Sequence, residues 1–168
     1  FIGSYNIWES ARLKHVPRII YASSIHAVGM YPSSEKIHTE VPHRPDTFYG
    51  LSKSFTENLA RMYWDKYKIE TVCLRILSCA KVTSERALST WLSYNDLIHL
   101  VEVSIKAPSA GFSVIYGVSN NERCNVNNGL NKHLNYYPKD NAEQFATDDL
   151  IQSDQKKRNV AEKEFHGG

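Results

Sequence analysis

Apolar residues recur along the chain with two different spacings. Near-helical spacing predicts four helices, the last of them short: residues 5–15, 48–68, 95–106 and 142–150. Short, continuously apolar runs predict three buried strands: residues 18–23, 70–76 and 113–118. Helices that alternate with strands apolar on both faces are typical of an α/β fold with a parallel sheet.

A long connection follows the first predicted strand. Residues 29–48 contain one glycine and three prolines and are predicted to form an irregular loop. Loops of this length inside a compact domain usually serve function. Ligands of parallel sheets bind at the carboxyl ends of the strands, so we expect chemistry in the loops that follow Ser23, Ile76 and Val118.

Length and composition narrow the function classes. The chain has 168 residues, which favours one domain, and 42% of them are hydrophobic. Its 20 basic and 18 acidic residues give a net charge of only +2, with the basic residues spread along the chain. This balance argues against a nucleic acid or an anionic membrane as partner. No apolar stretch approaches the ~20 residues of a membrane span.

The cysteines and histidines add two further expectations. Three cysteines, an odd number without C-x-x-C spacing, indicate a reducing compartment and hence a cytoplasmic location. The histidines show no metal-ligand spacing, so we expect no metal site.

Three residues suggest a reaction type. Tyr49 and Lys53 are four residues apart on a predicted helix and so lie on one face, while Ser24 ends the strand before the long loop. Hydride transfer from an alcohol to a nicotinamide needs a phenolate to take the hydroxyl proton, and a lysine ammonium one turn away favours that phenolate. A serine hydroxyl at the strand end can hold the substrate oxygen within hydrogen-bonding reach of the phenol.

The motifs around these residues resemble a known family. Tyr-Ala-Ser-Ser at residues 21–24 and Tyr-Gly-Leu-Ser-Lys at residues 49–53 are similar to the extended short-chain dehydrogenase/reductase superfamily, also called the NAD-dependent epimerase/dehydratase superfamily. Five further stretches resemble its uronate dehydrogenases in particular: residues 29–32, 44–46, 57–63, 88–91 and 138–143. The resemblance covers nearly the whole chain.

The resemblance implies a fold and a reaction. Residues 1–150 would form the C-terminal part of an NAD-binding Rossmann-type domain, a partial doubly wound parallel sheet with flanking helices, and residues 151–168 a polar tail. The implied activity is oxidation of C1 of galacturonate or glucuronate by NAD, which gives an aldarolactone.

It also implies roles for individual residues. Tyr49 would be the general base, Lys53 would bind the nicotinamide ribose and Ser24 would hold the reacting hydroxyl. Arg86 falls where a guanidinium grips the substrate carboxylate, a contact that its planar fork suits. The remaining expected positions are substrate contacts at Ile25, His26 and Ser78 and a cofactor contact at Cys79.

The sequence also departs from the family pattern. Ile25 replaces an asparagine that contacts substrate, and Leu77 replaces a glycine beside the site. No G-x-x-G-x-x-G loop occurs in the 168 residues, so we expect an upstream portion with that phosphate-binding loop to be missing and the edge of the first strand to be bare. Two alternatives stay open: a nucleotide-sugar epimerase or dehydratase, and an inactive truncated relative that associates with other chains. Assembly into a homo-oligomer is also open.

Overall fold

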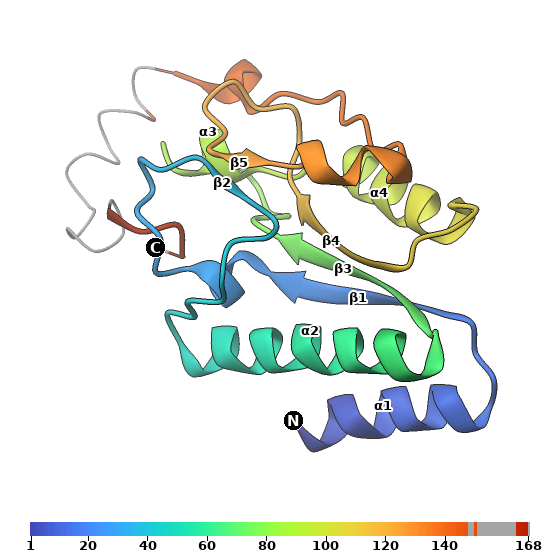
Figure 1. The fold of residues 1–168 in the computed structure, drawn as a ribbon. Helices are drawn as coiled ribbons and strands as arrows, with labels where there is room; N and C mark the ends of the chain where they lie inside the picture. The colour runs from blue at the N-terminus through green and yellow to red at the C-terminus, as the bar shows by residue number, and fades with distance from the viewer. Residues whose placement is uncertain (148–149, 151–163, 168) are drawn as a thin grey trace.

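A parallel sheet forms the centre of the molecule. The structure is a computed structural model, and it describes residues 1–147, 150 and 164–167. Three parallel strands, β1 (Arg18–Ser24), β3 (Glu70–Ile76) and β4 (Phe112–Gly117), lie in the order β1-β3-β4 (Figure 1). Their carboxyl ends therefore meet at one edge of the sheet, as the apolar runs predict.

Helices cover both faces of this sheet (Figure 1). Cys73 of β3 packs with Trp8 and Tyr63, which come from α1 (Ile2–Leu13) and α2 (Phe48–Tyr67). Its neighbours Val72 and Leu74 point to the opposite face, where they pack with Leu100 of α4 (Tyr94–Lys106). Alternate side chains of a strand face opposite sides, so a strand buried on both faces reads as continuously apolar. The expected α/β fold class is confirmed.

Side-chain caps set where the two long helices begin. The hydroxyl of Thr47 accepts a hydrogen bond from Gly50 N at 3.0 Å, and the hydroxyl of Ser93 accepts one from Asp96 N at 3.0 Å. Both caps satisfy backbone donors that the first helical turn leaves free. At its other end α2 stops at Lys68, whose φ of 58° is left-handed.

The sequence pattern misses the short elements. These are α3 (Ala87–Thr90), the two-residue strands β2 (Ile37–His38) and β5 (Val126–Asn127), and the 3₁₀ turns η1 (Ile25–Val28) and η2 (Gly129–Leu134). Of the helix predicted over 142–150, residues Ala142–Phe145 form a 3₁₀ turn, η3, and residues 148–149 lie outside the described chain. Elements of two to six residues are too short to show a period.

The two edges of the sheet differ. The side-chain amide of Asn128 occupies the place of a strand partner for β4, because its Oδ1 accepts from Tyr116 N at 2.8 Å and its Nδ2 donates to Tyr116 O at 2.9 Å. Strand β1 pairs with β3 on one side and has no strand on its other side within the described residues.

None of the helices in the described residues is long and apolar enough to cross a membrane.

Part of the range expected as a polar tail folds back onto the domain. Phe165 pairs with Pro32 in an antiparallel bridge, and Gly167 N donates to Gly29 O at 3.0 Å. Residues 164–167, called here the return segment, therefore lie beside the loop that follows η1 (Figure 1).

A buried ion pair lies between α2 and the sheet. Glu57 and Arg75 are 1% and 2% exposed, and Arg75 Nη2 donates to Glu57 Oε2 at 2.7 Å. Burial alone would raise the pKa of Glu57, but hydrogen bonds with His43 and Arg75 lower it to about 2. The carboxyl is therefore ionised in the folded protein at neutral pH.

This pair predicts a specific acid dependence of stability. A carboxyl whose pKa falls from 4.5 to about 2 on folding contributes stability that is complete above the higher value and is lost as the pH falls toward the lower one. We expect Glu57→Gln to lower the free energy of unfolding at neutral pH by about 3 kcal/mol, since it leaves the Arg75 charge buried and unpaired. Below pH ~4 the difference in free energy of unfolding between the wild type and Glu57→Gln should narrow. Denaturant unfolding across this pH range checks it, and parallel curves for the two proteins would contradict it.

Candidate active site

The first strand delivers a serine hydroxyl to the carboxyl edge of the sheet. At Ser24 the extended backbone of β1 gives way to η1, and the Ser24 side chain caps this turn by accepting a hydrogen bond from His26 N at 3.3 Å. The cap orients the Ser24 side chain, and the residue as a whole is 5% exposed. Ser24 and His26 are thus held together by one local turn.

A glycine lets helix α2 approach this turn closely. A Cβ atom on Gly50 would lie 2.1 Å from the carbonyl oxygen of His26, a distance that no real contact reaches. The first turn of α2 therefore lies against the backbone of η1 only because position 50 has no side chain. The same turn carries Tyr49, the predicted general base.

Tyr49 and Lys53 lie side by side next to the end of β1. Lys53 Nζ is 5.1 Å from the centre of the Tyr49 ring, and it donates a hydrogen bond to the carbonyl oxygen of Ala22 at 2.7 Å. The rings of Tyr49 and His26 meet edge-on with centres 5.6 Å apart. Tyr49 is 53% exposed, so its phenol is accessible to a bound molecule. The structure thus brings together four predicted site residues: Ser24, His26, Tyr49 and Lys53.

Asp46 orients His26, a role that the sequence pattern does not predict. Its carboxylate lies 2.8 Å (Oδ2) and 3.1 Å (Oδ1) from His26 Nδ1, and its side chain is 9% exposed. A carboxylate at Nδ1 holds the proton on that nitrogen and directs Nε2 away from Asp46. The only signal for this contact is the motif at residues 44–46, which identifies the family and not the partner of the aspartate.

Arg86 lies in a neighbouring cavity of about 300 Å³. Other lining residues include Leu77, Arg123, Phe165 and His166. The Arg86 guanidinium donates to the carbonyl oxygen of His166 at 2.6 Å. Tyr49 is not among the residues that line this cavity.

The return segment connects these two regions. Gly167 follows His166, and it lies so close to Asp46 that a Cβ on Gly167 would be 1.6 Å from Oδ2. Asp46 in turn holds His26 beside Tyr49. A continuous set of contacts therefore runs from Arg86 through the return segment to the predicted general base.

Three predicted positions lie elsewhere around the strand ends. Ile25 is 1% exposed and packs in an apolar cluster with Val28 and Tyr116, so its side chain belongs to the core and not to a substrate surface. The backbone of Ser78 pairs with Trp91 in an isolated parallel bridge. Burial raises the pKa of the Cys79 thiol, which keeps it protonated at neutral pH.

Comparison with known proteins agrees with this geometry. The model of the NAD dependent epimerase/dehydratase family matches residues 1–86. The chain belongs to this family. The uronate dehydrogenase of Agrobacterium fabrum (strain C58 / ATCC 33970) is 47% identical over 145 residues, which are 86% of this chain and 55% of that protein. The uronate dehydrogenase of Pseudomonas syringae pv. tomato is 44% identical over 85% of this chain and 52% of that protein.

Solved structures give the same result. A mutant of uronate dehydrogenase from Agrobacterium tumefaciens in complex with NAD has a TM-score of 0.92 at 42% identity, over 100% of this chain and 64% of that chain. Glucuronic acid dehydrogenase from Chromohalobacter salexigens has a TM-score of 0.91 at 38% identity, over 99% of this chain and 63% of that chain. The expected resemblance is confirmed, and the chain spans about half the length of the curated relatives that it matches.

The close approach at Gly50 predicts the outcome of a substitution. We expect Gly50→Ala to lower the free energy of unfolding by about 1–3 kcal/mol, because the new methyl group meets the His26 carbonyl and α2 must shift. Helix propensity alone would favour alanine by about 1 kcal/mol. Gly3→Ala on α1 is the matched control, since a Cβ there meets nothing within 4 Å. In denaturant unfolding, the free energy of unfolding should fall for Gly50→Ala and rise for Gly3→Ala, relative to the wild type. A Gly50→Ala variant as stable as Gly3→Ala would contradict the packing.

Proposed function

We propose that the protein to which this chain belongs oxidises C1 of galacturonate or glucuronate to an aldarolactone, with NAD as hydride acceptor. The observation that carries this proposal is the convergence of Ser24, Tyr49 and Lys53 at the carboxyl edge of the sheet. The names of the similar proteins, uronate and glucuronic acid dehydrogenases, support this substrate class.

The residues fit the reacting end of NAD. Lys53 presents an ammonium group and Tyr49 a half-exposed phenol next to the end of β1. We assign Lys53 to the ribose hydroxyls of the nicotinamide end and propose that residues 1–150 form the C-terminal part of the NAD-binding domain. No glycine-rich loop for the pyrophosphate occurs in the 168 residues.

The proton and the hydride leave the sugar in different directions. Tyr49 is the base that takes the proton of the C1 hydroxyl, and the Lys53 ammonium lies beside its ring, where a positive charge stabilises a phenolate. Bound NAD would supply the acceptor for the hydride from C1, a two-electron oxidation of that carbon. Ser24 donates to the same sugar oxygen and holds it in line with the phenol.

Arg86 and His26 select the substrate. A guanidinium in the cavity beside the strand ends recognises a planar carboxylate through paired, charge-assisted hydrogen bonds. His26, held by Asp46, offers a ring nitrogen to a sugar hydroxyl. These two contacts favour an acidic sugar over its neutral counterpart. We place the protein in the cytoplasm, a proposal that the free thiols of Cys73, Cys79 and Cys124 support. Assembly into a homo-oligomer stays a prediction.

The general base has a direct test. We expect Tyr49→Phe to lower kcat for galacturonate by about 10²–10⁴-fold, because it removes the proton acceptor and little else. NADH formation measured by absorbance gives the rate. Tyr94→Phe is the matched control, since Tyr94 is exposed at the start of α4, and it should leave kcat unchanged. A Tyr49→Phe variant with the kcat of the wild type would overturn this role.

The proposed contact between Arg86 and the substrate carboxylate is tested by comparing an acidic sugar with a neutral one. We expect Arg86→Met to raise KM for galacturonate by about 10²-fold, through the loss of one charge-assisted pair of hydrogen bonds, and to leave the rate with neutral galactose unchanged. Equal wild-type rates with galacturonate and galactose would exclude the assigned role of Arg86. Turnover of a nucleotide sugar and not of a free uronate would favour an epimerase or dehydratase.

A further inference from the structure

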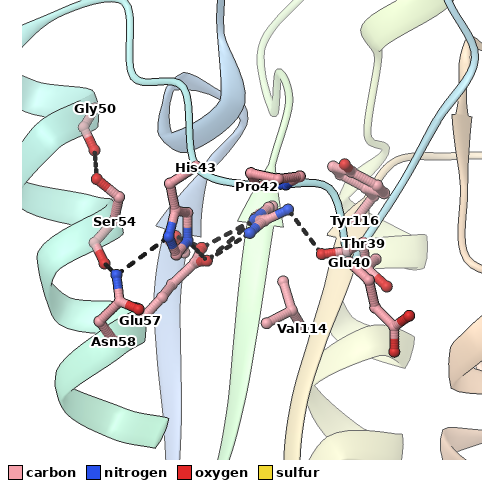
Figure 2. Close-up of polar contacts among 12 residues, drawn as sticks. Thr39, Glu40, Pro42, His43, Gly50, Ser54, Glu57, Asn58, Val114 and Tyr116 are labelled. Carbon is pink, nitrogen blue, oxygen red and sulfur yellow. Dashed lines mark hydrogen bonds and ion pairs between the residues drawn. The ribbon is translucent and has the colours of Figure 1, made fainter. Parts of the chain in front are cut away.

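A second polar cluster lies about two helical turns from Tyr49 and takes no part in the reaction proposed above. Its centre is Glu57 on α2, and its other members are Ser23, His43, Asn58 and Arg75, called here the Glu57 cluster. Figure 2 shows Glu57, His43 and Asn58 turned toward one another beneath the loop at Pro42. The cluster joins α2 to three other parts of the chain.

The carboxylate of Glu57 meets two neighbouring strands at the same level of the sheet. Ser23 on β1 donates its hydroxyl hydrogen to Oε1, and Arg75 on β3 donates from Nε to Oε1 at 3.0 Å and from Nη2 to Oε2 at 2.7 Å. Ser23 and Arg75 are direct partners in the β1–β3 register. One side chain of α2 therefore holds the ends of both strands.

The same carboxylate also holds the long loop. His43 Nε2 lies 2.8 Å from Glu57 Oε2, and its Nδ1 lies 3.1 Å from Asn58 Nδ2 (Figure 2). Arg75 Nη1 donates to the carbonyl oxygen of Thr39 at 3.1 Å. Residues 39–43 are thus fastened at both ends to the ion pair.

Burial makes these contacts strong and geometrically strict. Ser23 is 3%, Glu57 1% and Arg75 2% exposed. A buried ion pair adds little to stability relative to apolar residues, and in some proteins such a pair specifies one arrangement of the chain. Charged partners in a low-dielectric interior lose much more from a small displacement than two apolar side chains do.

Three contacts together fix α2 along the end of β1. Gly50 meets the backbone of His26, Lys53 donates to the carbonyl of Ala22, and Glu57 accepts from the hydroxyl of Ser23. Positions 50, 53 and 57 have the i, i+3, i+7 spacing of one helix face. A slip of one residue would move the helix by about 1.5 Å and turn that face by about 100°.

We propose that Glu57 is a positioning residue, which acts through Ser23 to hold the Tyr49–Lys53 face of α2 in register with Ser24. The inference rests on the proposed dehydrogenase function. Ser23 is adjacent to Ser24 in β1, and Lys53 precedes Glu57 by one helical turn of α2. The Ser23–Glu57 hydrogen bond therefore joins the strand that carries Ser24 to the helix that carries Tyr49 and Lys53. A misplacement of about 1 Å between reacting groups can cost about 10²-fold in rate.

The sharpest test is Ser23→Ala, which cuts the link to β1 and leaves the Glu57–Arg75 pair in place. In the holoenzyme we expect kcat for galacturonate to fall by about 10- to 100-fold, with KM for NAD and galacturonate within about twofold of the wild type. Ser23→Thr keeps a hydroxyl and should restore most of kcat.

Thr71→Val on β3 is the matched control. It also removes a buried sheet hydroxyl, but the Thr71 hydroxyl has no hydrogen-bond partner among the described residues. The control should keep the kcat of the wild type. If Ser23→Ala keeps it too, the positioning role is wrong.

Amide hydrogen exchange separates this proposal from the proposed function. In Ser23→Ala, we expect exchange to speed up at residues 24–28 and 48–53 and to stay unchanged in β4. A residue that only stabilises the fold would speed exchange in β4 as well, and this result would overturn the proposal. If the wild type does not oxidise uronates, the proposed function fails, and the exchange pattern still decides whether the cluster holds these two segments together.

Discussion

The contact between the first turns of α2 and the end of β1 is the constraint on which the rest of the site depends. It requires a glycine at position 50, because any side chain there would collide with the His26 carbonyl. It also requires polar partners further along α2, where Lys53 donates to the Ala22 carbonyl and Glu57 accepts from the buried Ser23 hydroxyl. The backbone contact at Gly50 and the buried carboxylate of Glu57 together fix the position of α2 relative to β1.

The sheet makes this constraint useful. Parallel pairing brings the ends of β1, β3 and β4 to one edge, where β1 ends at Ser24 and the chain after β3 leads to Arg86, which donates to the return segment. Chemistry assembled at such an edge draws on residues far apart in the sequence without distorting the core. The bare side of β1 within the described residues is where another strand would extend the sheet.

Much of the fold and part of the site are predictable from the sequence, for physical reasons. Helix α2 and strands β1 and β3 are long enough to show their period, and Tyr49 and Lys53 are neighbours through helix geometry alone. The tertiary partners are not predictable in this way. Arg75 lies inside an apolar run, and only the β1–β3 register and the placement of α2 give it Glu57 as a counter-ion.

The same limit explains Asp46 and the return segment. Asp46 is 20 residues from His26 in the sequence, and no periodic pattern links the two. Residues 164–167 look like the end of a polar tail until their backbone is seen to pair with the loop around Pro32. Ile25 shows the reverse case, since the family resemblance implied a substrate contact at this position and the packing places its side chain in the core.

The most direct measurement is a crystal structure of the protein with NADH and galacturonate bound. The account predicts that the hydroxyl oxygens of Ser24 and Tyr49 both lie within about 3.2 Å of the C1 oxygen of the sugar, with its carboxylate on Arg86. A sugar bound with C1 away from Ser24 and Tyr49, or with its carboxylate away from Arg86, would contradict the account.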